Sequence, residues 1–302
     1  MNSKNPTVSG TLYALAAFGM WGILPVYWKL LQQVPSPEIL AHRIFWSFVF
    51  VSLVLLVRRQ WGTMFQPLMD KKQRVSILIS SVLISLNWFI YIWAVNSAHI
   101  VEASLGYYIQ PLFYVFLGVV VFRERLNVWE GISFGLAIIG VIILTIKYGR
   151  FPWIAISLTL SLGSYGLCKK LVPVRSLTAV GLETLFISPL CLTYMGIRAY
   201  QGVGAFGTIS WRITLLLILA GVVTALPLLW FAQATKMIPL SRVGFIQYLS
   251  PTITLLLGVF IYHEPFTSSH LISFGCIWCA LVIYSCSHTP LLKRKQLQHK
   301  RP

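Results

Sequence analysis

Charged residues are scarce in this 302-residue chain, and acidic residues are the scarcest of them. Only 10% of the residues are charged, whereas soluble globular domains contain roughly 25%. Just 7 residues are Asp or Glu, 57% are hydrophobic, and the mean hydropathy is +0.77. This composition excludes a soluble globular domain and predicts a polytopic membrane protein.

Catalytic and nucleotide-binding motifs are also absent from the sequence. It contains no P-loop, no HExxH, no acidic DDxxD run and no Gly-x-Ser-x-Gly. ATP-driven transport by this chain alone therefore has no support. The five cysteines lie in apolar segments, and the CxxC spacing of Cys276 and Cys279 indicates ordinary helix packing. We predict that the protein is not an enzyme, holds no metal and needs no cofactor.

Long apolar runs are abundant, and they are continuous over about 20 residues, the length of a helix that crosses a bilayer. They predict ten transmembrane helices in an all-α protein, with no soluble domain between them. The predicted spans are residues 10–31, 38–57, 75–96, 103–122, 129–146, 152–168, 178–198, 212–234, 242–262 and 270–287.

The net charge of +17 follows the expected membrane topology. If the N-terminus is cytoplasmic, 18 of the 24 Lys and Arg residues fall on the cytoplasmic side. This bias fits the positive-inside rule and predicts that both termini are cytoplasmic. The basic residues do not indicate nucleic-acid binding, and we expect them to attract anionic lipid at the cytoplasmic face of the bilayer.

The second half of the chain repeats the first at a fixed offset. Ser104–Thr145 aligns without a gap with Gly244–Ser285, 140 residues later, and 11 of the 42 aligned positions are identical. A duplicated unit of five spans must lie in the membrane in two opposite orientations. We therefore predict two inverted five-helix repeats, residues 1–150 and 151–302, an arrangement that is common in secondary transporters.

Ionisable side chains inside predicted spans are candidate functional residues, because each costs free energy in lipid. Glu38 and His42 share one helix face, and Arg43 follows them. They either line the outer part of the substrate path, binding an ionic substrate or a proton, or Glu38 caps the start of the helix and pairs with Arg43 at the interface. Glu183 lies deep in the seventh span, and any partner must come from another helix. Its role is either to carry a proton or to stabilise the fold.

Aromatic and amide side chains form a second group of candidates. Asn87, Trp88 and Tyr91 lie in the third span, where they either contact a substrate or form hydrogen bonds between helices. The fourth and ninth spans carry prolines at matching repeat positions, flanked by polar and aromatic residues. Such symmetric proline-interrupted segments indicate the central site of a transporter. The candidates from these two spans are Tyr107, Tyr108, Gln110, Pro111, Gln247, Tyr248 and Pro251.

Two further patterns have structural interpretations. Glu124 and its repeat counterpart Glu264 end the fourth and ninth spans, where a carboxylate favours the start of the next helix. Gly131 and Gly135 share one face of the fifth span, and Gly163 and Gly166 lie in the sixth. We expect all four glycines to permit close packing of helices.

The order and spacing of several motifs resemble the RarD proteins over nearly the whole chain. The matching segments are Trp21-Gly22, Glu38 with His42-Arg43, Asn87–Asn96, Glu102–Tyr108, Glu124-Arg125, Leu182–Thr184, Ala220–Pro227 and Gln247-Tyr248 with Pro251. RarD proteins are bacterial inner-membrane permeases of the EamA branch of the drug/metabolite transporters, and their family name carries a link to chloramphenicol. The resemblance implies ten helices, two EamA repeats and cytoplasmic termini. Gln110 stands where family members usually have Asn.

These observations predict a multi-pass inner-membrane permease that moves a small organic metabolite or drug by alternating access. In this hypothesis Glu183, Glu38 and His42 sense protons, and Arg43 attracts an anionic group. Replacing Glu183 with Gln should then abolish pH-dependent transport. The alternatives are a membrane partner or regulator that does not transport, and a membrane-embedded transferase. The sequence leaves open a homodimer.

Overall fold

The computed structural model describes residues 6–96, 100–149, 151–171, 174–261 and 268–287. Within these ranges the chain forms 11 α-helices and two short 3-10 helices, and no strand. The α-helices are α1 (Pro6–Lys29), α2 (Ser36–Val57), α3 (Lys71–Asn96), α4 (Ile100–Phe122), α5 (Val128–Tyr148), α6 (Trp153–Leu171), α7 (Ser176–Tyr200), α8 (Trp211–Met237), α9 (Leu240–Gln247), α10 (Leu249–Phe260) and α11 (Ser268–Ser287). The 3-10 helices η1 (Trp61–Thr63) and η2 (Gln66–Leu68) lie between α2 and α3.

Each of the ten predicted spans coincides with helix, which confirms the all-helical fold class. Six helical segments of the described chain are long and apolar enough to cross a membrane, and they lie in α1, α2, α3, α4, α7 and α8. Shorter apolar segments lie in α5 and α11. Crossing by all ten segments, the inverted repeats and the cytoplasmic termini stay predictions.

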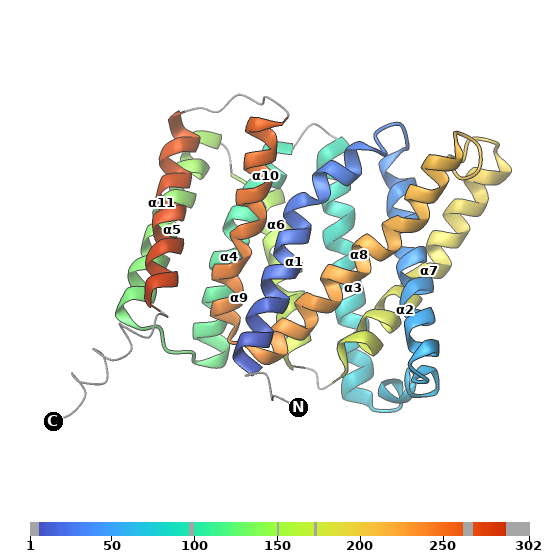
Figure 1. The fold of residues 1–302 in the computed structure, drawn as a ribbon, viewed down its shortest axis with the longest axis horizontal. Coiled ribbons are helices and arrows are strands. Elements are labelled where there is room, and N and C mark those ends of the chain that lie inside the picture. Colours follow the sequence, from blue (N-terminus) through green and yellow to red (C-terminus); the bar gives the residue numbers. More distant parts are fainter. Residues whose placement is uncertain (1–5, 97–99, 150, 172–173, 262–267, 288–302) are drawn as a thin grey trace.

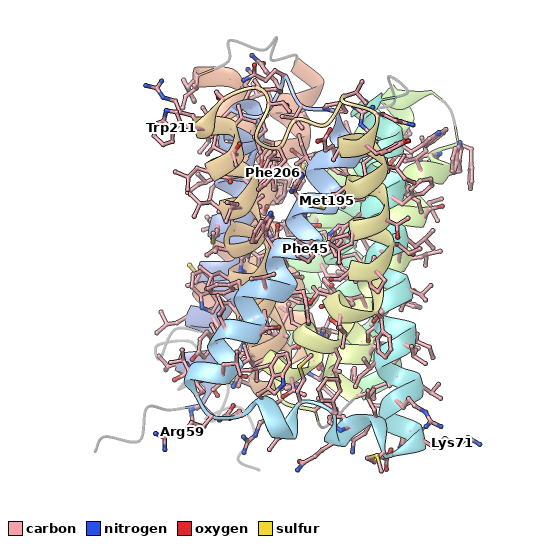
Figure 2. The ribbon with its side chains drawn as sticks, turned by 90° about the vertical axis from the view of Figure 1, so that its right-hand side faces the viewer. Phe45, Arg59, Lys71, Met195, Phe206 and Trp211 are labelled. Carbon is pink, nitrogen blue, oxygen red and sulfur yellow. The ribbon has the colours of Figure 1, made fainter. Side chains whose placement is uncertain are left out.

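The helices run along one common direction, so the bundle has two ends (Figure 1). The start of α1 and the end of α11 lie at the same end, which we call the terminal end. Figure 2 shows the basic residues Arg59 and Lys71 at this end, and Phe206 and Trp211 at the opposite, distal end.

Helices of the two predicted halves interleave. The pairs α2 with α7, α4 with α9, and α5 with α11 each join counterparts from the two halves. Other contacts are reciprocal, because α1 packs on α10 while α4 packs on α6, and α2 packs on α8 while α3 packs on α7. This reciprocal pattern is the one expected of two related halves, and it places the centre of the bundle between them.

Two glycines allow the closest crossings between the halves. A Cβ atom on Gly221 of α8 would lie 2.2 Å from the backbone carbon of Trp46 in α2. A Cβ atom on Gly244 of α9 would lie 2.6 Å from the backbone oxygen of Pro111 in α4. These neighbouring atoms belong to the backbone and cannot move aside as a flexible side chain can, so only glycine fits at these crossings.

The predicted packing glycines behave differently from one another. Cβ atoms on Gly163 and Gly166 would lie 2.1 Å and 2.5 Å from ring atoms of Phe113 and Tyr114, so these two positions do support close packing. No atom lies within 4 Å of a Cβ built on Gly131 or Gly135. The prediction of close packing at these two positions was therefore wrong within the described part of the chain, because no described atom approaches either position.

The predicted ninth span is broken at Tyr248 into α9 and α10. Pro251 has no amide hydrogen, so the carbonyl of Gln247 loses the donor that a continuous helix would supply. Pro111 lies at the matching position in α4, which continues through it without a break. The prediction of a symmetric interruption therefore holds in the second half only.

Candidate functional site

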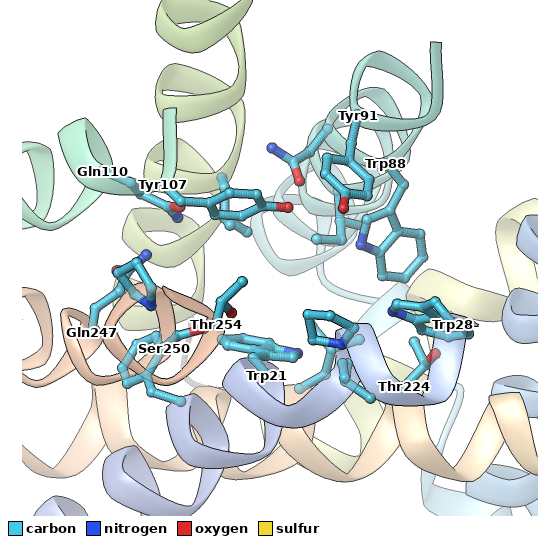
Figure 3. A pocket seen from close by; sticks show the side chains of 18 of the residues that line it. Trp21, Trp28, Trp88, Tyr91, Tyr107, Gln110, Thr224, Gln247, Ser250 and Thr254 are labelled. Atoms are coloured by element: carbon cyan, nitrogen blue, oxygen red, sulfur yellow. The ribbon is translucent and has the colours of Figure 1, made fainter. Parts of the chain in front are cut away.

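A cavity of about 230 Å³ lies where helices from both halves meet (Figure 3). Its walls come from the distal part of α1, from α2, α3, α4, α6 and α8, and from the broken helix α9–α10. The lining residues are Phe18, Trp21, Leu24, Pro25, Trp28, Arg43, Ile84, Asn87, Trp88, Tyr91, Tyr107, Tyr108, Gln110, Leu162, Thr224, Leu228, Gln247, Ser250, Pro251 and Thr254. Ligand pockets are commonly about 300–1,000 Å³, so this cavity suits a small ligand.

Arg43 is the one charged residue among those that line the cavity. Its guanidinium carbon lies 5.0 Å from the ring centre of Trp28 and 4.7 Å from that of Trp88. The Nε atom of Arg43 is buried without a hydrogen-bond partner. Among the residues whose side chains the structure describes, Arg43 forms no ion pair, and its described contacts are with aromatic faces.

Amide and hydroxyl groups supply the remaining polarity of the cavity. Asn87 is held in place, since its Nδ2 atom donates to the backbone oxygen of Leu158 at 2.9 Å and to Ser161 Oγ at 3.0 Å. Gln247 Oε1 and Thr224 Oγ1 are buried and have no hydrogen-bond partner in the described structure, whereas the Gln110 amide interacts with the Tyr114 hydroxyl. Buried polar atoms are normally satisfied, so the first two atoms have hydrogen-bonding capacity left for a ligand.

Aromatic side chains close the bundle between the cavity and the terminal end. The ring centre of Phe231 in α8 lies 5.6–6.3 Å from those of Phe18, Trp21, Tyr114 and Tyr165, which come from α1, α4 and α6. The Tyr114 hydroxyl also donates to the backbone oxygen of Leu162 at 2.9 Å. Phe231, Tyr114 and Tyr165 lie about one turn further toward the terminal end than the lining residues Leu228, Gln110 and Leu162 of the same helices, so this Phe231 cluster joins both halves on the terminal side of the cavity.

Glu124 makes a second closing contact, at the terminal end itself. Its carboxylate accepts from the backbone amides of Leu240 and Ser241 at 2.8 Å and 2.9 Å, and from Ser241 Oγ at 2.6 Å. Lys170 of α6 lies 3.4 Å from Glu124 and donates to the backbone oxygen of Ile238 at 3.1 Å. Glu124 therefore caps the start of α9, whose own N-cap residue, Pro239, has no side-chain hydrogen bond.

Opposing effects set the pKa of Glu124. Burial raises it, but the hydrogen bonds from Ser241 and Leu240 and the charge of Lys170 outweigh burial and lower the pKa below its ordinary value of 4.5.

The predicted role of Glu124 at the start of the next helix was wrong. Asn127 and Glu130 form the capping box of α5 instead. Glu264 lies outside the described residues.

Comparisons with known proteins decide the family. The model of the EamA-like transporter family matches residues 8–146 and 152–286. The chain belongs to the EamA-like transporter family. The uncharacterized transporter YojE of Bacillus subtilis is 48% identical over 285 residues, which cover 93% of this chain and 95% of YojE.

The RarD resemblance is confirmed as well. Protein RarD of Escherichia coli is 40% identical over 285 residues, covering 94% of this chain and 96% of RarD, so the chain is a RarD-type EamA protein. A solved crystal structure matches with a TM-score of 0.67 at 18% identity, covering 92% of this chain and 98% of that one. This last likeness concerns the fold alone.

Nine of the fourteen residues predicted for the substrate path line the cavity of this EamA-like protein. They are Arg43, Asn87, Trp88, Tyr91, Tyr107, Tyr108, Gln110, Gln247 and Pro251. Tyr248 does not line the cavity, and its hydroxyl donates to the backbone oxygen of the lining residue Tyr108 at 3.4 Å. Pro111 is buried between α4 and α9 and does not line the cavity.

Glu38 and His42 lie beside the connection between α7 and α8, and neither lines the cavity. Glu38 Oε1 accepts from the backbone amide of Ala205 at 2.5 Å, and its Oε2 lies 3.6 Å from Arg198 Nε. His42 stacks on Phe206 at 5.0 Å. The alternative in which Glu38 pairs with Arg43 was wrong, because the carboxylate faces α7 and Ala205.

Glu183 forms a buried ion pair away from the cavity. Both of its carboxylate oxygens lie 2.7 Å from Lys169 Nζ, and the Tyr165 hydroxyl donates to Oε2 at 3.1 Å. The partner comes from α6, as predicted for a residue without a basic neighbour on its own helix. Lys236 approaches from α8 and donates to the backbone oxygen of Val174.

Several functional candidates were missed by sequence reasoning. Trp28, Thr224, Ser250 and Thr254 line the cavity, but apolar and small polar residues of this kind occur throughout membrane helices. Lys169 was placed just beyond the predicted sixth span. The Ser and Gly residues before it are weak helix formers and gave no signal that α6 continues through Lys169 to Leu171.

Proposed function

We propose that this protein is a secondary transporter of the bacterial inner membrane that moves a small organic compound by alternating access. Membership of a transporter family supports the class. The observation that carries the proposal is the cavity between the two halves, separated from the terminal end by the Phe231 cluster. A site at the repeat interface, closed toward one side, is the arrangement that alternating access requires.

The transport cycle then opens the closed end. The Phe231 cluster and the contacts of Glu124 both join parts of the two halves, so rocking one half against the other would separate them. Such rocking would expose the cavity toward the terminal end and cover it toward the distal end. Anionic lipid at the cytoplasmic face and a second copy of the chain stay predictions.

Proton coupling belongs to this proposal only as a prediction. Glu38 and His42 lie outside the cavity, and Glu183 is occupied by Lys169 and Tyr165. The ion pair supports a structural role for Glu183, and the stability of a Glu183→Gln variant separates this role from that of a proton carrier.

The function is tested by blocking the cavity. Thr254 lines the cavity from α10, whereas Leu256, two residues later on the same helix, is 42% exposed and does not line it. Cells expressing the wild type, Thr254→Trp or Leu256→Trp at equal membrane levels are compared by mass spectrometry of cell contents and medium, with and without added chloramphenicol.

We expect a compound that the wild type and Leu256→Trp redistribute and that Thr254→Trp does not. If the wild type redistributes nothing under several growth conditions, or if both variants act as the wild type does, transport through this cavity is refuted. A membrane partner or regulator would then become the better interpretation.

A further inference from the structure

The charge of the cavity identifies the kind of cargo. Among the residues whose side chains the structure describes, the cavity is lined by one cation, Arg43, and by no acidic residue. An uncompensated charge in a low-dielectric site is costly, and a bound anion offsets that cost. We propose that the cargo is a small organic anion with a single carboxylate-like group on a planar apolar body, bound through Arg43. This inference rests on the proposed transport function.

The geometry around Arg43 favours a planar, two-oxygen acceptor. The guanidinium carbon lies 5.0 Å and 4.7 Å from the ring centres of Trp28 and Trp88, and an indole ring offers the N–H groups of Arg43 no oxygen acceptor. The N–H donors point outward in the plane of the guanidinium, where a carboxylate can accept two parallel hydrogen bonds. The unpartnered Nε atom shows that the protein itself leaves part of this edge unused.

The remaining walls fit a flat apolar body. The rings of Tyr91 and Tyr107 lie 5.8 Å apart at 70°, and Trp21 faces the cavity from α1 (Figure 3). Leu24 and Ile84 add aliphatic contacts. An aromatic or conjugated ring would bury its faces against these side chains, where aromatic contacts add to the gain from burial.

A second polar group is recognised at the other end of the cavity. In Figure 3 Gln110 and Gln247 lie on one side of the cavity, and Trp28 and Trp88 lie on the other. Gln247 Oε1 is buried and unpartnered, and the Gln110 amide beside it also interacts with the Tyr114 hydroxyl, so Gln247 can accept from one hydroxyl group at this end of the cavity. The favoured cargo therefore carries its anionic group and a neutral polar group at opposite ends.

Amines are disfavoured by the same arrangement. An ammonium group in the cavity would meet no carboxylate among the lining residues and would be repelled by Arg43. The geometry therefore selects simple acids over zwitterionic amino acids and over cationic drugs. A neutral compound of the same shape would leave Arg43 uncompensated.

The test uses four probes of similar shape on the purified full-length protein in detergent. They are 4-hydroxybenzoate, benzoate, neutral 4-hydroxybenzamide and cationic tyramine, and binding is measured by isothermal titration calorimetry and by ligand-dependent thermal stabilisation. We expect 4-hydroxybenzoate to bind most tightly, benzoate less tightly, and the amide and amine at least tenfold more weakly than 4-hydroxybenzoate.

Variants separate recognition from folding. Arg43→Gln removes an unpaired charge, so we expect this variant to fold at least as stably as the wild type. It also loses a charge-assisted pair with the ligand, so we expect it to bind 4-hydroxybenzoate roughly tenfold to hundredfold more weakly. Arg43→Lys keeps the charge without the planar edge and should recover only part of the affinity. Gln247→Leu should bind both acids but lose the preference for the hydroxyl.

These measurements either support or overturn the proposal that the cargo is an organic anion. Equal or tighter binding of the amide or amine, absence of binding by both acids, or unchanged acid binding in Arg43→Gln would overturn the anion proposal. Failure of this proposal and failure of transport are distinguishable. Redistribution of a neutral or cationic compound in cells refutes only the cargo class, whereas Arg43-dependent binding without any redistribution in cells refutes only transport.

Discussion

Replacing Glu183 with Gln tests whether the buried ion pair stabilises the fold. Lys169 and Glu183 are 3% and 4% exposed, and both carboxylate oxygens lie 2.7 Å from the ammonium nitrogen. The Gln side chain can still accept from the Tyr165 hydroxyl, but it leaves the ammonium of Lys169 buried without a counter-charge. Removing one partner of a buried pair costs about 3–5 kcal/mol.

The expected loss is measurable as a change in melting temperature. For a chain of roughly this size about 1 kcal/mol corresponds to 2–4 °C, so Glu183→Gln should lower Tm by on the order of 10 °C. Thermal unfolding of the detergent-purified protein, followed by size-exclusion chromatography, measures this change. The double variant Lys169→Met, Glu183→Gln removes both charges and should recover most of the loss, because replacing a buried pair by neutral residues is often close to neutral.

A proton carrier predicts a different pattern. Glu183→Gln would then keep its Tm and would lose only the pH dependence of transport, and the double variant would not restore that dependence. The reasoning from the ion pair is refuted if Glu183→Gln melts within about 2 °C of the wild type. It is also refuted if the double variant is no more stable than the single one.

Three other predictions follow from contacts between helices. Glu124→Ala should destabilise the closed terminal end by about 1–2 kcal/mol, the range of a helix cap, and should increase labelling of a cysteine placed in the Phe231 cluster. Folding lowers the pKa of Glu124, so its carboxylate stabilises the closed terminal end fully above the ordinary pKa of 4.5. This stabilisation is lost as the pH falls through the pKa of Glu124 in the folded protein. Labelling of the wild type should therefore rise only in acid. Gly221→Ala should reduce the yield of folded protein strongly, whereas Gly131→Ala should leave it unchanged, because only the first meets backbone atoms. Glu38→Ala should speed proteolysis of the connection between α7 and α8, since it frees the amide of Ala205.

Each of these predictions has a contradicting result. Labelling that is equal in Glu124→Ala and the wild type would show that this carboxylate does not hold the terminal end closed. Equal yields for Gly221→Ala and Gly131→Ala would contradict the close crossing of α2 and α8. Unchanged proteolysis in Glu38→Ala would mean that the connection is held by its other contacts, such as the stacking of Phe206 on His42.

The sequence by itself determined where the helices lie and which family the chain joins. Apolar runs of membrane-spanning length are local features, so each of the ten predicted segments is helical. The aromatic and amide candidates were also identifiable, because polar groups in apolar helices are few and cost free energy in lipid. Seven of these aromatic and amide candidates line one cavity, together with the predicted residues Arg43 and Pro251.

The tertiary structure alone decided which side chains meet. Glu183 pairs with Lys169 of another helix, Glu124 caps α9 instead of α5, and Gly131 faces open space although Gly221 meets a backbone. Contacts between helices depend on the rotation of each helix about its axis and on its register against the neighbour. Neither quantity is set by local hydropathy, because residues on every face of these helices are apolar, and only the packing of the two halves selects among the alternatives.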